Sequence, residues 1–434
     1  MMPTPPTKSA SYNPLQGFAA PFTRSRAFPF LWLAHLISFL GSSVTMVILP
    51  VLVYSLTGST TIMGFVMAVY MLPNIIMLPI AGHIVDRHDR VRIMMLADIL
   101  RFVIMLSTAA LSLSGLLSIP VLMVLIGFYG MLDGLFQPAY AAMRATVFTA
   151  DIRVAANSLT QMSTQTVRLI GPALGGLLVT HLSAGIGFGL DALTYLLSLV
   201  CLVYLRRVLA LKLLPQQPAA PADSTGIVVP EAEADWRADF KEGIAVLRSH
   251  PWLWITILAF SFVNICYGGI TVILVPWLFK VHHGWPPYLY GLAVTFSGVG
   301  AILGGLLFGM RPVWKHRGLM AYGGALLSGL ALLLLPFAQT ASGAIALFAV
   351  EGFGLMIFGL IWEISLQELV PQEAFGRVAS LDMLGSFALL PLGYVLVGWL
   401  ADLIGGVATI AIFAGIGMAC ITFVLSIPAI RRFQ

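Results

Sequence analysis

Charged residues and cysteines are scarce in this sequence of 434 residues. Asp, Glu, Lys and Arg together make up only 9% of it, and it has three cysteines. Cys201, Cys266 and Cys420 lie far apart in apolar stretches, so they show neither disulfide nor metal-ligand spacing. The sequence contains neither a GxxxxGK(S/T) phosphate loop nor an HExxH pair, so nothing in it indicates ATP hydrolysis or zinc chemistry. We expect no enzyme activity, no cofactor and no metal site.

Long hydrophobic runs are abundant instead. Hydrophobic residues make up 59% of the chain and the mean hydropathy is +0.95, far from the values of soluble domains. A helix of about 18 or more apolar residues crosses a bilayer core of about 30 Å. Twelve runs are long enough: 28–56, 61–85, 93–113, 119–143, 156–180, 185–205, 251–279, 288–310, 318–338, 343–366, 378–402 and 406–428. We therefore predict an all-α membrane protein with twelve transmembrane helices embedded in a lipid bilayer.

The placement of the basic residues predicts how the chain crosses the membrane. All Lys and Arg residues except Arg101, Arg168 and Lys280 lie in the tails or in alternate loops. Basic residues favour the cytoplasmic side, so both termini are expected in the cytoplasm, with the protein in the inner (plasma) membrane. The net charge of +5 thus reflects topology, and we expect no nucleic-acid partner.

The longest loop divides the chain into two halves. We predict a tail at 1–27, a six-helix bundle at 28–205, a cytoplasmic linker at 206–250, a second six-helix bundle at 251–428 and a tail at 429–434. Trp236, Phe240, Ile244 and Leu247 follow helical spacing at the end of the linker, which predicts an interfacial helix.

A weak repeat relates the two halves. At an offset of 222 residues, Gly171 and Gly176 align with Gly393 and Gly398. Two repeated six-helix bundles predict a secondary transporter whose substrate path runs between them, although similar glycine spacing could also reflect helix packing alone.

The loop "GHIVDRHDRVR", residues 82–92, concentrates charge between two apolar runs. It resembles the signature loop between the second and third helices of the major facilitator superfamily, at Gly82, Asp86, Arg87, Arg90 and Arg92. Asp89 replaces the family's second glycine, and we expect this to be tolerated because Asp adopts left-handed turn geometry more readily than most residues.

The resemblance implies that this loop is a conformational latch. In the family, the aspartate is thought to meet the N-terminal end of the eleventh helix while the cavity faces outward. That helix is expected to start near Arg377, with Asp382 as a partner for Arg87 or Arg92. Asp98 and Arg101 are three residues apart, so we expect them to pair and to belong to the same network. A simple topology anchor would explain the arginines but not Asp86.

The stretch "RLIGPALGG", residues 168–176, resembles the fifth-helix motif of antiporter branches of the superfamily. The matching positions are Gly171, Pro172, Gly175 and Gly176. Small residues allow helices to approach closely, and proline removes a backbone donor. Together with "GFGLDALTYLLS" and "EGIAVLRSHPWLW", this stretch is similar to the branch of macrolide efflux proteins and the enterobactin exporter. The resemblance implies drug–proton antiport and export rather than uptake.

Ionisable groups within spans are costly, so each is a functional candidate. Asp133 and Arg168 are expected roughly 21 Å and 18 Å from the outer ends of adjacent spans, and we predict a buried pair. This pair could be a fixed bridge or a proton switch. Glu351 has no partner evident in the sequence and is a second proton candidate. Asp191 and His35 are further candidates, for which helix packing is the competing interpretation.

Polar and aromatic residues at helical spacing are the candidates for a substrate cavity. They are Tyr70, Asn74, Gln161, Gln165, Asn264, Tyr267, Phe358 and Trp362. Such a cavity would suit small amphipathic organic substrates, although half of these side chains could face other helices or lipid.

The sequence therefore predicts a monomeric exporter of amphipathic organic compounds that exchanges them for protons. One alternative is export of a specific endogenous metabolite, either a siderophore or a lipid-like compound. Another, from a different class, is a membrane sensor that does not transport.

Overall fold

The structure is a computed structural model that describes residues 14–212, 245, 247–309, 316–370 and 372–431. Every regular element among these residues is a helix. The first half contains α1 (Pro14–Arg24), α2 (Phe28–Thr57), α3 (Thr60–Arg87), α4 (Arg90–Leu113), α5 (Ile119–Val147), α6 (Arg153–His181) and α7 (Ala184–Lys212). The second half contains α9 (Pro251–Gly269), η1 (Ile270–Leu274), α10 (Val275–Trp277), η2 (Leu278–His282), α11 (Pro287–Gly309), α12 (Arg317–Leu334), η3 (Leu335–Phe337), α13 (Ala341–Leu369), α14 (Gln372–Phe387), α15 (Leu390–Ile404), α16 (Gly406–Leu425) and α17 (Pro428–Arg431).

The described helices reproduce the predicted spans. Eleven helical segments are long and apolar enough to cross a membrane, judged by length and composition. The remaining predicted span, 156–180, corresponds to α6. This helix has 29 residues, enough to cross a membrane, but it is more polar than the other spans. Its polarity has a structural reason, because α6 lies between the halves and contacts both α2 and α11. The predicted twelve-helix architecture is confirmed.

Two spans depart from regular helices. The seventh passes through two π-helical segments, η1 and η2, and such segments often occur at functional sites. The eleventh is interrupted between α14 and α15 at Ala388 and Leu389. Beside this break, the Ser261 hydroxyl donates to the carbonyl of Gly385, and the Asn264 amide donates to the carbonyl of Ser386 at 3.0 Å. Side chains of α9 thus satisfy carbonyls near the interruption.

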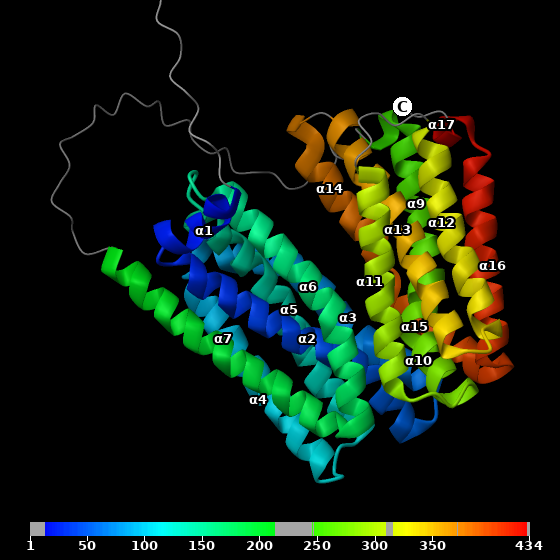
Figure 1. The fold of residues 1–434 in the computed structure, drawn as a ribbon, viewed down its shortest axis with the longest axis horizontal. Helices are drawn as coiled ribbons and strands as arrows, with labels where there is room; N and C mark the ends of the chain where they lie inside the picture. The colour runs from blue at the N-terminus through cyan, green and yellow to red at the C-terminus, as the bar shows by residue number, and fades with distance from the viewer. Residues whose placement is uncertain (1–13, 213–244, 246, 310–315, 371, 432–434) are drawn as a thin grey trace, which may run out of the picture.

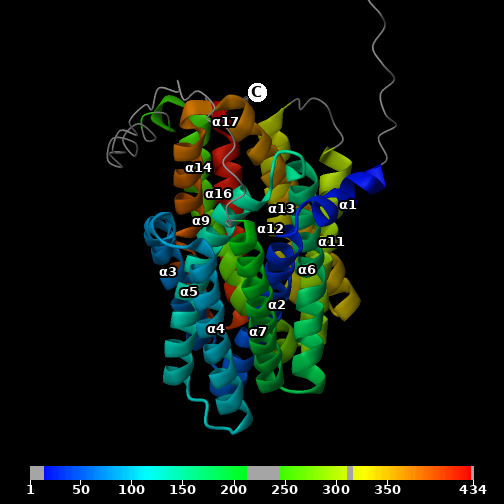
Figure 2. The ribbon, with the colours of Figure 1, turned by 90° about the vertical axis from the view of Figure 1, so that its left-hand side faces the viewer.

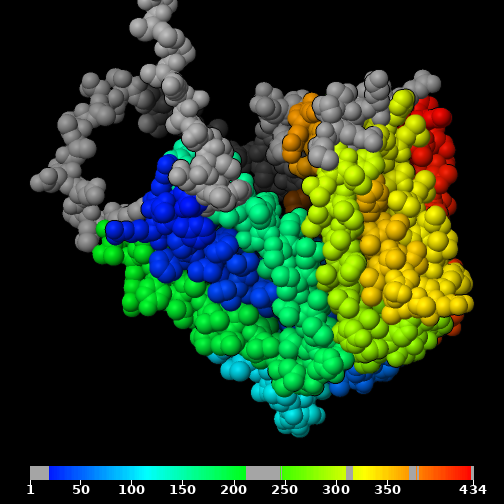
Figure 3. Space-filling model, viewed as in Figure 1, coloured from blue at the N-terminus to red at the C-terminus, as the bar shows by residue number. Residues whose placement is uncertain are grey.

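The helices form two bundles, α1–α7 and α9–α17, that meet at an angle (Figure 1). The bundles separate at the end that carries α1, α14 and α17, here called the terminal side, and Figure 2 shows these helices at the same end. They converge at the opposite end, near α10, here called the loop side. Figure 3 shows the surface hollowed between the halves on the terminal side. Two helix pairs, α3 with α15 and α6 with α11, carry most of the contact between the halves.

Much of the predicted linker lies outside the described residues. Of the predicted interfacial helix, Leu247 is described, in a short helical turn, whereas Trp236, Phe240 and Ile244 are not. The described part of α7 continues to Lys212, past the predicted end of the first bundle at 205.

Candidate functional site

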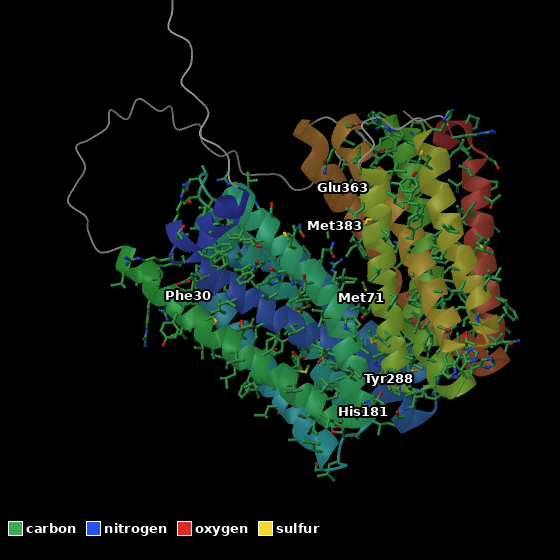
Figure 4. The ribbon with its side chains drawn as sticks, in the orientation of Figure 1. Phe30, Met71, His181, Tyr288, Glu363 and Met383 are labelled. Carbon is green, nitrogen blue, oxygen red and sulfur yellow. The ribbon has the colours of Figure 1, made fainter. Side chains whose placement is uncertain are left out.

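A cavity of about 580 Å³ lies between the two halves. Helices α2 to α6 supply most of its wall, and the second half supplies Val272, Tyr290, Val294 and Tyr394. Met71, labelled in Figure 4, is part of this wall and lies in the region between the bundles. Asp133, Arg101 and Arg168 carry the formal charges among the described lining residues.

Asp133 belongs to a charged cluster at the cavity surface. Arg101 Nη1 donates to Asp133 Oδ1 at 3.3 Å, and Arg101 Nη2 donates to Asp98 Oδ1 at 2.5 Å. The Tyr70 hydroxyl donates to Asp133 Oδ2 at 3.1 Å. The Arg101 and Asp98 side chains are 2% and 0% exposed, whereas Asp133 is 19% exposed. The cluster therefore presents one accessible carboxylate in front of a buried ion pair.

The Arg101 guanidinium is also held by aromatic faces. It lies 4.2 Å from the ring centroid of Phe136 and 4.6 Å from that of Tyr195, within the range of cation–π attraction. The Ser198 hydroxyl donates to Asp98 Oδ2 at 2.6 Å, which ties α4 to α7. These contacts compensate for removing a guanidinium and a carboxylate from water.

Two sequence expectations need correction here. Asp133 pairs with Arg101 and not with Arg168, because α4 and α5 are neighbours and the Arg101 side chain fills the space between them. Arg168 lies in the wall of the same cavity, and its side chain is exposed. Asp98 and Arg101 do pair, as predicted, but they lie in the bundle core and at the cavity, not with the latch loop.

The other two first-half candidates have different environments. His35 lines the cavity and stacks on Tyr140 with ring centroids 4.0 Å apart. Asp191 is fully buried between α2 and α7, where it accepts hydrogen bonds from Thr45 at 2.5 Å and Thr194 at 3.3 Å. These contacts favour the packing interpretation of Asp191, while a proton role for His35 stays a prediction.

Glu351 lines a smaller chamber of about 220 Å³ inside the second half. The side chain is 6% exposed and accepts a hydrogen bond from Ser297 at 2.8 Å. The aromatic residues Phe260, Tyr267 and Tyr394 form part of the chamber wall. Tyr394 also lines the larger cavity, so the two spaces share a wall.

The candidate cavity residues divide into four pairs. Tyr70 and Asn74 line the central cavity, and Asn264 and Tyr267 line the smaller chamber. Gln161 and Gln165 have exposed side chains on α6 and line neither space. Phe358 and Trp362 belong to an aromatic stack, with Phe260 and Phe358 centroids 3.5 Å apart and Phe358 and Trp362 centroids 6.2 Å apart. The central cavity also has Gln137 in its wall, a residue that the sequence analysis did not select.

The latch loop lies on the terminal side. Asp86 and Arg87 are exposed at the end of α3, and an added side chain on Gly82 would meet open space. Arg90 reaches across to α5, where it donates to the Ala142 carbonyl at 3.3 Å and to Thr146 at 3.1 Å.

Asp89 is tolerated for a different reason from the one expected. Its φ is −61°, so it does not adopt the left-handed conformation. Its carboxylate caps the N-terminus of α4 by accepting from the amides of Val91 at 2.9 Å and Arg92 at 3.1 Å. Arg92 also pairs with Asp89 at 3.5 Å.

Among the residues that the structure describes, the predicted latch contact is not formed in this conformation. Asp382 accepts a hydrogen bond from the Trp362 indole at 3.1 Å, within its own half, rather than from Arg87 or Arg92. The helix that carries Asp382 begins at Gln372, close to the expected start near Arg377. The halves are separated on this side, so the latch role stays a prediction about the other facing state.

The loop side is closed by a contact that the sequence analysis missed. The Asp402 carboxylate, on α15, accepts five hydrogen bonds from the N-terminus of α3. The donors are the hydroxyls of Ser59, Thr60 and Thr61 at 2.6–2.7 Å and the amides of Thr60 and Thr61 at 3.0 Å. We call this group of residues the Asp402 clasp. It joins an acid in one half to the positive end of a helix in the other.

The glycine-rich motif on α6 closes the same side. A side chain at Gly171 would overlap Ser43, and one at Gly175 would crowd Val44, both on α2. A side chain at Gly176 would lie 2.9 Å from the Cα of Tyr288 on α11, so this glycine permits the contact between halves. His181 stacks on Tyr288 nearby, with ring centroids 6.4 Å apart, and Figure 4 labels both residues at the loop side. The predicted close helix approach is confirmed.

Sequence comparison places the chain among known transporters. It is 28% identical over 366 residues to an uncharacterized MFS-type transporter, YfiS, of Bacillus subtilis, covering 81% of this chain and 82% of that protein. It is 22% identical to macrolide efflux protein A of Streptococcus pyogenes, covering 86% and 89% of the two chains. It is 26% identical to the multidrug efflux pump Tap of Mycolicibacterium fortuitum, covering 85% and 88%.

Solved structures share the fold at low identity. A peptide transporter POT in complex with sulfate matches with a TM-score of 0.69 and 16% identity, covering 97% of this chain and 99% of that one. A bacterial homologue of the iron transporter ferroportin matches with a TM-score of 0.66 and 17% identity, covering 92% and 97%. The family model of the Major Facilitator Superfamily matches residues 31–389, most of the chain. The chain is therefore a multi-pass membrane protein that belongs to the Major Facilitator Superfamily.

Proposed function

We propose that this protein exports small amphipathic organic compounds across the plasma membrane in exchange for protons. Relatives named as macrolide and multidrug efflux pumps cover most of its length, which supports export. The observation that carries the proposal is the position of Asp133, a partly exposed carboxylate on the central cavity with a buried guanidinium behind it.

The proposed orientation places the terminal side in the cytoplasm, because the basic residues concentrate in the tails and loops at that end. The structure then represents a conformation open to the cytoplasm, in which substrate enters the cavity. The opposite conformation would require release of the Asp402 clasp and separation of α6 from α11. Such rocking of two bundles around a central site is the usual form of alternating access.

The cavity wall suits varied amphipathic ligands. Met46, Met67 and Met71 supply flexible apolar surface, while Tyr70 and Asn74 supply polar groups. Methionine side chains adapt to different shapes, which favours weak selectivity. A volume of about 580 Å³ is in the range of sites for small organic molecules.

Asp133 would couple the proton to this cycle. In the ionised state it accepts hydrogen bonds from Arg101 and Tyr70. Protonation removes the negative charge, which weakens its interaction with Arg101 and makes the cavity more positive. Proton binding then biases the equilibrium between the two facing states, since the charged and neutral forms interact differently with the surrounding groups.

The test uses full-length protein in proteoliposomes with a trapped pH indicator. For the wild type we expect proton movement when an efflux substrate such as ethidium is added. Asp133→Asn should bind ethidium but move no protons. The matched control is Asp151→Asn, an exposed carboxylate on the loop between α5 and α6, which should behave as the wild type. Full proton movement by Asp133→Asn would leave the Asp133–Arg101 pair as a fixed bridge.

A second candidate function is export of one endogenous metabolite, either a siderophore or a lipid-like compound. The cavity walls do not distinguish it from multidrug export, but a substrate screen does, because a dedicated exporter would respond to one chemical class only. A sensor that does not transport would show no proton movement with any compound. We propose that the working unit is a monomer, since both walls of the cavity come from one chain.

A further inference from the structure

We propose that the Glu351 chamber is a subsite for a primary or secondary ammonium group, carried by an amphipathic amine whose apolar body lies in the central cavity. This inference rests on the proposed export function, for which it names a substrate class. It is carried by the chamber's shape, its charge and the buried hydroxyl group of Tyr267, which lacks a partner within the described structure.

The chamber offers one negative charge and several acceptors. Glu351 is the only formally charged side chain among the described residues that line it. The Tyr267 hydroxyl is buried, since this residue is 7% exposed, and it has no hydrogen-bond partner within the described structure. Ser328 is 1% exposed and lies beside the Glu351 carboxyl. Unpartnered buried polar groups are costly, so the Tyr267 oxygen is a group that a ligand in the chamber would satisfy.

The Tyr267 hydroxyl lies against α12, the helix that carries Ser328. A side chain added at Gly329, the residue after Ser328, would lie 2.0 Å from the Tyr267 hydroxyl oxygen. Ser328 lines the same chamber as Glu351. An ammonium group with at least two N–H donors would satisfy the carboxylate and a hydroxyl oxygen together. The rings of Phe260, Tyr267 and Tyr394 would also favour a cation.

The size of the chamber indicates that it holds only part of a ligand. Its volume of about 220 Å³ is below the range of about 300–1,000 Å³ that is usual for whole ligands. It shares Val272 and Tyr394 with the central cavity. Val272 lies in the π-helical segment η1, and Tyr394 follows the interruption between α14 and α15. The wall between the two spaces is thus built from irregular stretches of two helices, as at the substrate sites of many transporters.

The test compares three fluorescent ligands of nearly equal size: a dansyl alkylamine with a free primary amine, its N-acetyl analogue, and its trimethylammonium analogue. Binding is measured by fluorescence titration of full-length protein in lipid nanodiscs. We expect the wild type to bind the primary amine at least about 10-fold more tightly than the neutral analogue, as befits a charge-assisted contact. The trimethylammonium analogue has no N–H donor and should fall between them.

Glu351→Gln should reduce the affinity for the primary amine to that of the N-acetyl analogue and leave the latter unchanged. Tyr267→Phe keeps the ring and should weaken only the ligand with N–H donors, by a few-fold. The matched control is Glu363→Gln, an exposed acid on the same helix and about 18 Å from Glu351 along its axis. Retained binding of the N-acetyl analogue shows that each variant is folded. If Glu351→Gln does not fold, the test relies on Tyr267→Phe.

Equal affinity of the wild type for the amine and its N-acetyl analogue would overturn the inference, as would undiminished selectivity in Glu351→Gln. Either result would leave Glu351 to act as a proton site or a structural group. Because these are equilibrium measurements, they do not depend on a proton gradient. Absence of proton-driven efflux would contradict the proposed function while leaving the selectivity for ammonium ligands measurable.

Discussion

The Asp402 clasp should control how strongly the protein prefers the conformation that is closed on the loop side. Substituting Asp402 with alanine removes all five hydrogen bonds to the N-terminus of α3. A hydrogen bond to a charged group is worth about 1.5–3 kcal/mol when it is isolated and well shielded. Asp402 is exposed and the five bonds share one carboxylate, so solvent screening and non-additivity reduce the total.

We expect a net loss of about 2 kcal/mol, near the upper end for charges at helix N-termini. A change of that size shifts the ratio of the two facing states about 30-fold, since 1.4 kcal/mol corresponds to a factor of ten. Asp402→Asn keeps one acceptor oxygen but loses the charge, so its shift should be smaller. Asp151→Asn, at an exposed acid in a loop remote from the clasp, is the matched control.

The assay measures distances between spin labels in full-length protein. Cysteines are introduced at Leu116, in the loop between α4 and α5, and at Phe337, at the end of η3, after replacement of the three native cysteines. These two residues are 72% and 66% exposed. Asp402→Ala should move a substantial fraction of molecules to longer distances. A distance distribution identical to that of the wild type would refute the reasoning and show that glycine packing between α6 and α11 closes this side unaided.

Three further substitutions test the site. Gly176→Val should prevent close contact between α6 and α11, because the new side chain meets backbone atoms rather than a flexible side chain. We expect transport to fall at least about 10-fold without loss of folded protein, and an unchanged transport rate would contradict this. Arg101→Gln should destabilise the first bundle by about 3–5 kcal/mol, since it leaves Asp98 and Asp133 without their cation, and a melting temperature within a degree of the wild type would disprove it. Asp89→Ala should cost about 1 kcal/mol through loss of the α4 cap, measured by thermal unfolding, whereas Asp89→Asn should retain most of it.

The span pattern was predictable because run length and polarity alone determine which segments cross a membrane. The π-helical segments of the seventh span and the interruption of the eleventh were not predictable from run length and polarity. The apolar run 251–279 continues without a break through η1 and into the start of η2, and the run across Ala388 and Leu389 is also unbroken. These departures depend on neighbouring helices, such as the donation from Asn264 to the Ser386 carbonyl.

The sequence predicted which residues line the central cavity better than it predicted which of them pair with each other. Depth along a helix placed Asp133 and Arg168 at similar levels, and both do line the central cavity. Depth does not give the rotation of a helix, so it could not show that Arg101 faces Asp133 from α4. The pairing of Asp98 with Arg101 was predictable because a separation of three residues fixes their relative orientation on one helix.

The residues of the Asp402 clasp have recognisable features in the sequence, although the sequence analysis did not select them. Ser59, Thr60 and Thr61 follow Gly58 directly, which is typical of a helix N-terminus, and Asp402 stands at the end of an apolar run. Each feature was visible in the sequence, but their proximity depends on how the two halves pack. The chamber around Glu351 was hidden for the same reason, since its walls come from separate helices of the second half.

Proton-driven movement of substrate by the wild-type protein is the most direct test of the proposed antiport. Purified full-length protein is reconstituted into vesicles with an acidic lumen, and uptake of ethidium and of a macrolide is followed with and without an ionophore that dissipates the pH gradient. We expect both compounds to accumulate only while the gradient lasts, and Asp133→Asn to abolish the accumulation. Uptake at the same rate with and without the gradient, or no uptake of any compound, would contradict proton-coupled export.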